Sequence, residues 1–192
     1  MQPIYLLAQH QFLIENADDK SLRQQLKTQG VDARRLSRFS QLALLGALPL
    51  QPQISPNTSI YLGSRFASPS KFNKMFQQLN QQDLPSPLDF MANLNNAATF
   101  QLAQTLHMHG TTLFLAVNAA TLLQPLQLAT LELQKAEPAM ALVGWAWENP
   151  DPNGKHGSHW LLLSNHPPEN ATPFVQGEKE LRQSLHNLFQ IV

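Results

Sequence analysis

The feature that most constrains the fold is a short apolar run that passes into a helical pattern, and it occurs twice. The run Ser59–Ser64 is followed by Ser68 and Pro69, which are typical of a helix cap and a first helical position. The run Leu113–Val117 passes through small residues into a second helical stretch. Strands that alternate with helices indicate a layered α/β fold whose sheet is covered by helices on both faces.

The end of the chain adds a different signal. Pro138–Glu148 and Ser158–His166 have the composition of strands, and the turn-rich segment NPDPNGKHG joins them. They predict a C-terminal antiparallel hairpin, so the sheet should be mixed and mostly parallel. Ile4–Ile14 is rich in strand formers as well. A chain of 192 residues can bury one sizeable core, and we expect a single domain over residues 1–192.

The remaining helices are expected from spacing and caps. In DARRLSRFSQLALLGAL, Asp32 is the candidate N-cap of a helix whose apolar stripe comprises Leu36, Phe39, Ala43 and Ala47. The helix that begins at Pro69 is expected to place Phe72, Met75, Phe76 and Leu79 on one face. Ser86 and Gly110 should bound one long helix, whose small and polar middle, NLNNAAT, is typical of close approach by another backbone or subunit. Thr121 should begin the helix after the second apolar run.

Composition excludes several classes of function. The chain has no cysteine, so it has no disulfide scaffold, no thiolate metal site and no cysteine nucleophile. Lys and Arg number 13 and Asp and Glu number 13, so net charge gives no reason to expect nucleic acid or an anionic membrane as partner. The first residues lack a basic start and no stretch has the length of a membrane span, which predicts a cytoplasmic protein.

Two side-chain groups are candidates for a site. Ser64 follows a strand, but it lacks the second glycine of a hydrolase elbow and no partner residues can be placed by spacing. The histidines form no pattern of metal ligands, so no metal and no cofactor are expected. Positive charge is concentrated in the first half of the chain, where either a solvated face or a contact with an acidic partner such as an acyl carrier protein would explain it. The candidate contact residues are Arg34, Arg35, Arg38, Arg65 and Lys71.

Four stretches, in this order and at this spacing, resemble the N-terminal half of a beta-ketoacyl-acyl-carrier-protein synthase, a family with the thiolase fold. They are DARRLSRFSQLALLGAL, SPLDFMANLNNAATFQLAQTLHMHG, TTLFLAVNAATLLQPLQLATLEL and PAMALVGWAWE, and with HGSHWLLLSNH the resemblance covers roughly residues 32–166. Active members carry a cysteine where an ungapped match places Ala119, and a shift of one residue would choose Asn118 or Ala120. The family's two catalytic histidines belong to a second half that this chain is too short to contain. The resemblance therefore transfers no catalytic residue.

The resemblance is greatest to short ketosynthase-like N-terminal domains of the chain-length-factor type, found in type II polyketide systems that include those making aryl polyene pigments. It implies a catalytically inactive subunit that pairs with a full-length ketosynthase as a heterodimer and helps shape the tunnel for the growing chain. The implied partner interface is Asn93, Asn96, Ala97 and Phe100. The turn after the strand Leu113–Val117, where active members carry the cysteine, is called the elbow below. The implied acyl pocket around it comprises Phe114, Asn118, Ala119, Ala120 and Thr121. Two alternatives stay open, namely a stand-alone acyl-binding homodimer and a serine hydrolase or acyltransferase that uses Ser64.

Overall fold

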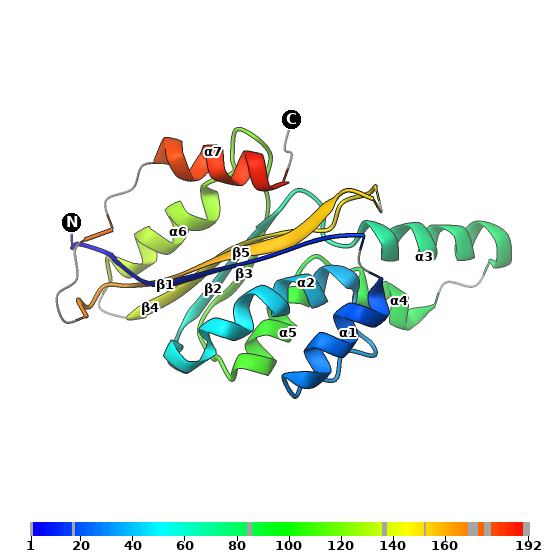
Figure 1. The fold of residues 1–192 in the computed structure, drawn as a ribbon, viewed down its shortest axis with the longest axis horizontal. Helices are drawn as coiled ribbons and strands as arrows, with labels where there is room; N and C mark the ends of the chain where they lie inside the picture. Colours follow the sequence, from blue (N-terminus) through cyan, green and yellow to red (C-terminus); the bar gives the residue numbers. More distant parts are fainter. Residues whose placement is uncertain are drawn as a thin grey trace.

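A five-stranded sheet forms the centre of the computed structural model, which describes residues 2–16, 18–83, 86–135, 138–151, 153–168, 173–174 and 178–189 (Figure 1). The strands are β1 (Tyr5–Glu15), β2 (Ser59–Ser64), β3 (Thr112–Ala116), β4 (Met140–Trp147) and β5 (Lys155–Ser164). Their order across the sheet is β1-β5-β4-β2-β3. Both strands expected from the apolar runs and both strands of the C-terminal pair are therefore present.

Strand direction confirms a mixed sheet. β2 pairs in parallel with both β3 and β4, whereas β5 lies between β4 and β1 and is antiparallel to each. Four strands consequently run in one direction and β5 runs in the other. The carboxyl ends of β2, β3 and β4 meet at one edge of the sheet, which is where α/β folds usually place their sites.

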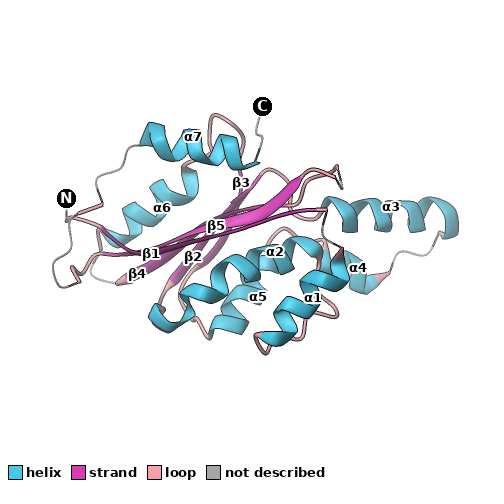
Figure 2. Ribbon diagram, in the orientation of Figure 1, coloured by secondary structure: helices cyan, strands magenta, loops and turns pink. Residues whose placement is uncertain are grey.

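Helices cover both faces, as the sequence predicts (Figure 2). The helices are α1 (Asp19–Thr28), α2 (Arg38–Ala47), the 3-10 helix η1 (Leu48–Gln53), α3 (Pro69–Gln82), α4 (Pro87–Ala92), α5 (Ala97–Leu106), α6 (Gln124–Leu133) and α7 (Glu178–Phe189). One face carries α2 and α5, with α1 packed on α2, and the other carries α6 and α7. Helix α3 extends away from the sheet beside α4 (Figure 1).

Alternation along the strands divides the core into two apolar clusters. Leu142 and Ala146 of β4 face the cluster beneath α2 and α5, whereas Val143 and Trp145 face the cluster beneath α6. Gly144 lies against the Trp160 ring, where an added Cβ would come within 2.1 Å of the ring atom Cε3. A side chain at position 144 would therefore push the β5 tryptophan out of the core.

The helix predicted from Asp32 begins later than expected. Ser37 is the N-cap of α2, and its hydroxyl accepts the backbone N–H of Ser40 at 3.2 Å. Asp32 instead accepts the backbone N–H of Arg34 at 3.2 Å and binds its guanidinium. This local turn competes with helix formation, as short acidic side chains often do, so the assignment of Asp32 as the cap is wrong.

The long helix predicted between Ser86 and Gly110 is two helices. Ser86 does cap α4 by accepting the N–H of Asp89, but α4 ends at Ala92 and α5 begins at Ala97. The break contains three asparagines, Asn93, Asn95 and Asn96, whose side chains compete with backbone hydrogen bonds and lower helix propensity. Helix α5 ends at Leu106, followed by His107 in the left-handed conformation with φ of 55°.

The helix expected to start at Thr121 begins at Gln124. Residues 119–123 form turns instead, because the Thr121 hydroxyl accepts the N–H of Asn118 at 2.9 Å and holds the preceding turn. The predicted cap thus closes the turn before the helix, and the helix itself starts without a side-chain cap.

Candidate functional site

The elbow that follows β3 is held together by one side chain. The Asn118 amide oxygen, Oδ1, accepts the backbone N–H of Ala120 at 2.9 Å and that of Thr121 at 3.0 Å. The Thr121 hydroxyl donates to the same oxygen at 3.2 Å. Immediately before the elbow, the N–H of Val117 is bonded to the carbonyl of Ser64 on β2. This Asx-type turn uses the N–H groups that an elbow would otherwise offer to a ligand.

This geometry gives Ala119 no means of catalysis. A methyl group cannot attack a thioester, and two neighbouring N–H groups, those of Ala120 and Thr121, are already bonded to Asn118. Oxyanion stabilisation needs unoccupied donors aimed at the reacting atom. The favourable N-terminal end of α6 also lies at Gln124, five residues beyond Ala119, and the effect of a helix dipole fades within about one turn.

Side chains from two distant elements also donate hydrogen bonds to the residues of the elbow and the turn after it. Arg182 of α7 donates from Nη1 to the carbonyl of Ala119 at 2.6 Å, and Trp145 of β4 donates from its indole N–H to the carbonyl of Leu122 at 2.7 Å. Ala119 packs against the apolar cluster beneath α6 and α7. Sequence reasoning missed Arg182, because a bond between residues 63 positions apart leaves no local pattern.

Phe114, predicted to share a pocket with the elbow, lies on the other side of the sheet. Its ring meets Phe39 of α2 edge-on, with centroids 6.2 Å apart. It lines a groove of about 590 Å³ at the carboxyl ends of the parallel strands. The groove is bounded by Arg65, Phe66, Ala67, Ser68, Pro69, Phe72, Asn73, Asn93, Asn95, Phe114, Ala116 and Pro150. The predicted pocket is thus divided, with Phe114 in this carboxyl-end groove and Asn118, Ala119, Ala120 and Thr121 in the turn beyond it.

The four predicted interface residues are all accessible at the surface. Asn93 and Asn96 lie at the break between α4 and α5, while Ala97 and Phe100 lie on α5, where Phe100 is 62% exposed. Beside them runs β3, the last strand of the sheet in the described residues, with no strand on its outer side. A second groove, lined by Asn93, Asn96, Leu113 and Phe114 among others, joins the break to this open edge. The structure therefore brings Asn93 and Asn96 to the open edge, whereas Ala97 and Phe100 line a separate groove beside the start of α2.

The five cations predicted to contact a carrier protein do not form one patch. Arg38 is 11% exposed and bonded to Asp19, and Lys71 is bonded to Asp89 at 3.0 Å. Arg65 lies elsewhere, over the Phe66 ring at 5.3 Å from its centroid. Arg34 is exposed and bidentate with Asp32, whose pKa is lowered to about 2 by the hydrogen bonds from Arg34. Arg35 lies next to it and lines two surface grooves.

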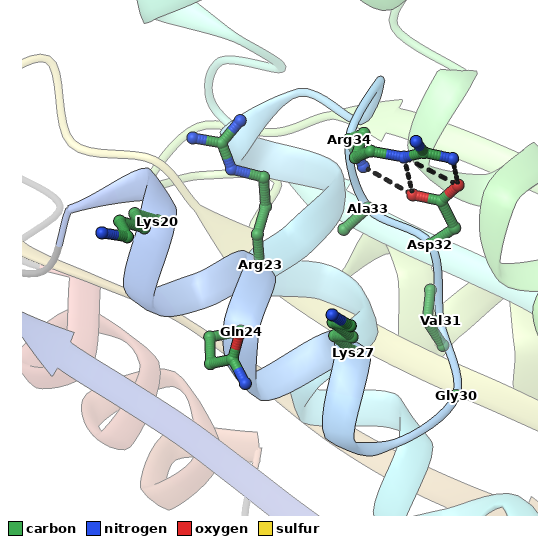
Figure 3. Close-up of a pocket in the computed structure, with 9 residues that line it drawn as sticks. All are labelled: Lys20, Arg23, Gln24, Lys27, Gly30, Val31, Asp32, Ala33 and Arg34. Atoms are coloured by element: carbon green, nitrogen blue, oxygen red, sulfur yellow. Dashed lines mark hydrogen bonds and ion pairs between the residues drawn. The ribbon is translucent and has the colours of Figure 1, made fainter.

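Helix α1 supplies cations that the sequence analysis overlooked. A basin of about 590 Å³ is lined by Lys20, Arg23 and Lys27 from α1 and by Arg34 from the following loop (Figure 3). Asp32 is the one acid among its lining residues, and Arg34 already engages it. The spacing of Lys20, Arg23 and Lys27 is that of one helix face, so this cationic basin could have been predicted once the stretch was assigned as a helix.

Ser64 is poorly placed to be a nucleophile. It is 3% exposed, and its hydroxyl donates to the backbone carbonyl of Phe66 at 2.6 Å, where a base would be needed to activate it. Among the described residues, no group of three or more His, Cys, Asp or Glu side chains could hold a metal ion. No helix in the described part of the chain is long and apolar enough to cross a membrane.

This architecture defines the class of fold, which is that of ketosynthases and chain length factors. A search of solved structures finds ketosynthases and their complexes with chain length factors among its matches. A scan against family models finds no match, and a search of curated proteins finds none either. The likeness is therefore one of fold, with sequence identities below 20% in the structures described next.

One match is the complex of the ketosynthase ApeO with its chain length factor ApeC from Xenorhabdus doucetiae, at a TM-score of 0.65 and 18% identity over 84% of this chain and 79% of that one. The ishigamide ketosynthase/chain length factor matches at a TM-score of 0.67 and 15% identity, over 89% of this chain and 64% of the other. AntDE in complex with the acyl-carrier protein AntF matches at a TM-score of 0.67 and 13% identity, over 85% of this chain and 62% of the other. This chain thus spans less than two thirds of the matched chains in the last two, whereas the chain matched in the ApeO complex is close to it in length.

Proposed function

We propose that this chain is a non-catalytic, chain-length-factor-like subunit that pairs with an active ketosynthase and shapes its acyl tunnel. The observation that carries the proposal is the elbow after β3. The ungapped match to the ketosynthase family places the nucleophile position at Ala119, and Asn118 takes up the neighbouring N–H groups. The fold of a ketosynthase is kept without the cysteine nucleophile that condensation uses, which fits the role of a partner subunit.

The open edge of β3 supports association with a second subunit. An unpaired edge strand exposes a row of N–H and C=O groups and favours pairing with another chain. Leu113 on this strand is 40% exposed, and Phe100 on the neighbouring helix α5 is more exposed still. We propose that Asn93, Asn96, Ala97 and Phe100 contact the ketosynthase, and that the small side chain of Ala97 permits close approach.

The carboxyl-end groove is the part of this chain that would face an acyl group. Phe66, Phe72 and Phe114 supply apolar side chains to its lining, which also includes Asn73, Asn93 and Asn95. Such a lining suits an apolar chain that carries few polar groups. Under this proposal the elbow residues Asn118, Ala119, Ala120 and Thr121 fix the end of β3 in place, and Phe114 provides the acyl contact.

An acidic carrier protein is proposed as a further partner at the cationic basin. Lys20, Arg23 and Lys27 supply positive charge that meets no acid among the lining residues except Asp32. Complementary charge of this kind accelerates association with an acidic surface and weakens as salt concentration rises. Arg35 lies in an adjoining groove with Arg34, whereas Arg34, Arg38 and Lys71 each have an acidic neighbour. The predictions of a single domain and of a cytoplasmic location stay predictions.

The proposal is tested by co-expression with a ketosynthase from the same gene neighbourhood, followed by measurement of complex mass and condensing activity. A stoichiometric complex that is active only when both chains are present is the expected result. Leu113→Lys on β3 should break the complex, whereas Leu13→Lys should not, because Leu13 has a matching exposure of 42% on β1 at the opposite edge of the sheet. A wild-type chain that stays homodimeric and binds acyl groups alone would instead support the stand-alone binding protein.

A second test addresses the elbow. Ala119→Cys should add a thiol but no condensing activity, because the neighbouring N–H groups remain bonded to Asn118. Its alkylation rate should rise with pH around the ordinary thiol pKa of about 8.5. A strongly lowered thiol pKa would show that the elbow still activates a nucleophile, and would contradict the non-catalytic role.

A further inference from the structure

Helix α3 presents an apolar face that nothing in the described chain covers. Phe72, Phe76 and Leu79 are 50%, 54% and 44% exposed, and none of the fourteen residues of the helix is buried. Their spacing of three and four residues predicts a core-facing stripe, yet the stripe faces outward. The Phe72 and Phe76 rings stack, with centroids 6.1 Å apart and planes at 11°.

The helix is held in position although its apolar face is free. At its N-terminus the Glu148 carboxylate, 1% exposed, accepts the backbone N–H of Ser70 at 3.0 Å. In the first two turns of the helix, Lys71 and Lys74 both bind Asp89 of α4, at 3.0 and 2.9 Å. These bonds fix the start of α3 against β4 and α4. A surface that is already ordered loses less conformational entropy when a partner covers it.

The α3 face is continuous with the open edge of β3. Phe72 lines the carboxyl-end groove together with Phe114 and Ala116 of β3. The groove at the α4–α5 break is lined by the same two β3 residues, so the two depressions adjoin. A surface with apolar side chains among asparagines therefore runs from β3 through the carboxyl-end groove to Phe72 of α3.

Size and charge indicate what covers this surface. The β3 edge has five residues and is about 17 Å long, whereas a stable interface buries about 800 Å² on each partner. The edge strand needs adjoining surface, and α3 supplies it. From Met75 to Gln82 the helix has no charged residue, while its two lysines are already bonded to Asp89. The matching partner surface is therefore apolar and uncharged.

We propose that α3 is a docking arm whose Phe72, Phe76 and Leu79 face is buried by the ketosynthase subunit that also pairs with β3. This inference rests on the proposed function and extends it to a specific contact. The arm widens the interface beyond the edge strand and sets the position of Phe72 in the wall of the carboxyl-end groove. Partner binding and groove shape are thus connected through one helix.

The test compares two double variants of the full chain against the co-expressed ketosynthase. Phe76→Ser with Leu79→Ser removes the apolar face, and Gln77→Ser with Gln81→Ser is the matched control on the polar side of the same helix. The apolar pair should weaken the complex by at least about tenfold, while the control should bind like the wild type. Hydrogen exchange of the α3 amides should slow on complex formation. Both variants should fold, because all four side chains are exposed in the free chain.

The outcomes separate this inference from the proposed function. If the wild-type chain forms the complex but the Phe76 and Leu79 variant binds equally well and α3 gains no protection, the arm is refuted and the subunit function stands. If the wild-type chain forms no complex, the function and the arm both fail. If the variant instead converts a homodimer of the isolated chain into a monomer, the occupant is a second copy and the proposal is overturned.

Discussion

Helices α2 and α3 both carry apolar residues at spacings of three and four, but α2 is apolar at most of its positions and α3 on one face only, and their environments are opposite. Nine of the ten residues of α2 are buried, between the sheet and helices α1 and α5, whereas α3 has no buried residue in fourteen. In α2 even Ser40 and Gln41 are 2% exposed, because neighbouring elements surround the whole helix. The apolar side chains of α2 stabilise the fold of this chain, whereas Phe72, Phe76 and Leu79 of α3 are exposed, and we propose that a partner subunit covers them.

The largest expected effect is a difference in stability between two variants, each of which replaces one phenylalanine of α2 or α3 with alanine. Phe39→Ala in α2 should lower the free energy of unfolding by about 3–5 kcal/mol, because Phe39 is 1% exposed and packs against Phe114. Phe76→Ala in α3 should change it by about 0.5 kcal/mol or less in the isolated chain. Urea unfolding of the two variants measures both values. Equal losses would show that α3 is covered in the free chain, and the contrast would fail.

This contrast also marks how far the sequence can predict the structure. Periodicity places α2 and α3 as helices, but the period identifies only the apolar face and says nothing of its neighbour. The division of the helix predicted between Ser86 and Gly110 was visible as a run of asparagines, since these residues favour turns over helix.

The site was less predictable than the fold. The absence of cysteine excludes a cysteine nucleophile, and the resemblance places the family's nucleophile position near Ala119. The bonds of Arg182 and Trp145 to the elbow depend on distant segments meeting in space, so no local pattern shows them. The sequence analysis predicts one pocket that contains both Phe114 and Asn118. In the structure the two are separate, because side chains alternate between the two faces along β3 and because Asn118 belongs to the turn that follows the strand.

The second effect tests how closely α2 fits the sheet. An added Cβ at Gly46 would lie 2.1 Å from the Ser158 hydroxyl and 2.8 Å from Cδ1 of Trp160. Gly46→Ala should therefore destabilise the chain by about 1–3 kcal/mol through overpacking, despite the better helix propensity of alanine. Thermal unfolding measures the loss. Asn80→Ala on α3 is the control, and it should leave the midpoint nearly unchanged because Asn80 is exposed.

The third effect concerns Glu148, where α3 meets the body of the protein. Burial raises the pKa of this carboxyl above its ordinary 4.5, and the hydrogen bond from Ser70 and the charge of Arg38 oppose that rise only in part. The folded chain thus holds the proton more tightly than the unfolded chain. The resulting stabilisation is complete below pH 4.5 and is lost as pH rises through the folded pKa.

Glu148→Gln should remove this pH dependence while its amide oxygen still accepts the Ser70 N–H. The free energy of unfolding of the variant should equal that of the wild type at acidic pH and should be higher by about 1 kcal/mol at neutral pH. Unfolding by urea across this pH range gives the two curves. Parallel curves would mean that the pKa of Glu148 is the same in the folded and unfolded chains. The start of α3 would then be held chiefly by Lys71 and Lys74.

The smallest effect distinguishes those two lysines. Lys71 is 25% exposed and Lys74 is 55% exposed, and both bind Asp89, whose pKa is lowered by the hydrogen bond from Lys74 and then by that from Lys71. Exposed ion pairs contribute about 0.2–1 kcal/mol to the free energy of unfolding. Lys71→Met should lower it more than Lys74→Met within that range, because Lys71 is less exposed and water screens its ion pair less. The lowered pKa means that this contribution is present above about 3.8 and fades as pH falls through the folded pKa, opposite in sign to Glu148. Hydrogen exchange in α3 should rise in both variants, and an unchanged rate in both would show that α3 is held to the body by the Glu148–Ser70 contact alone.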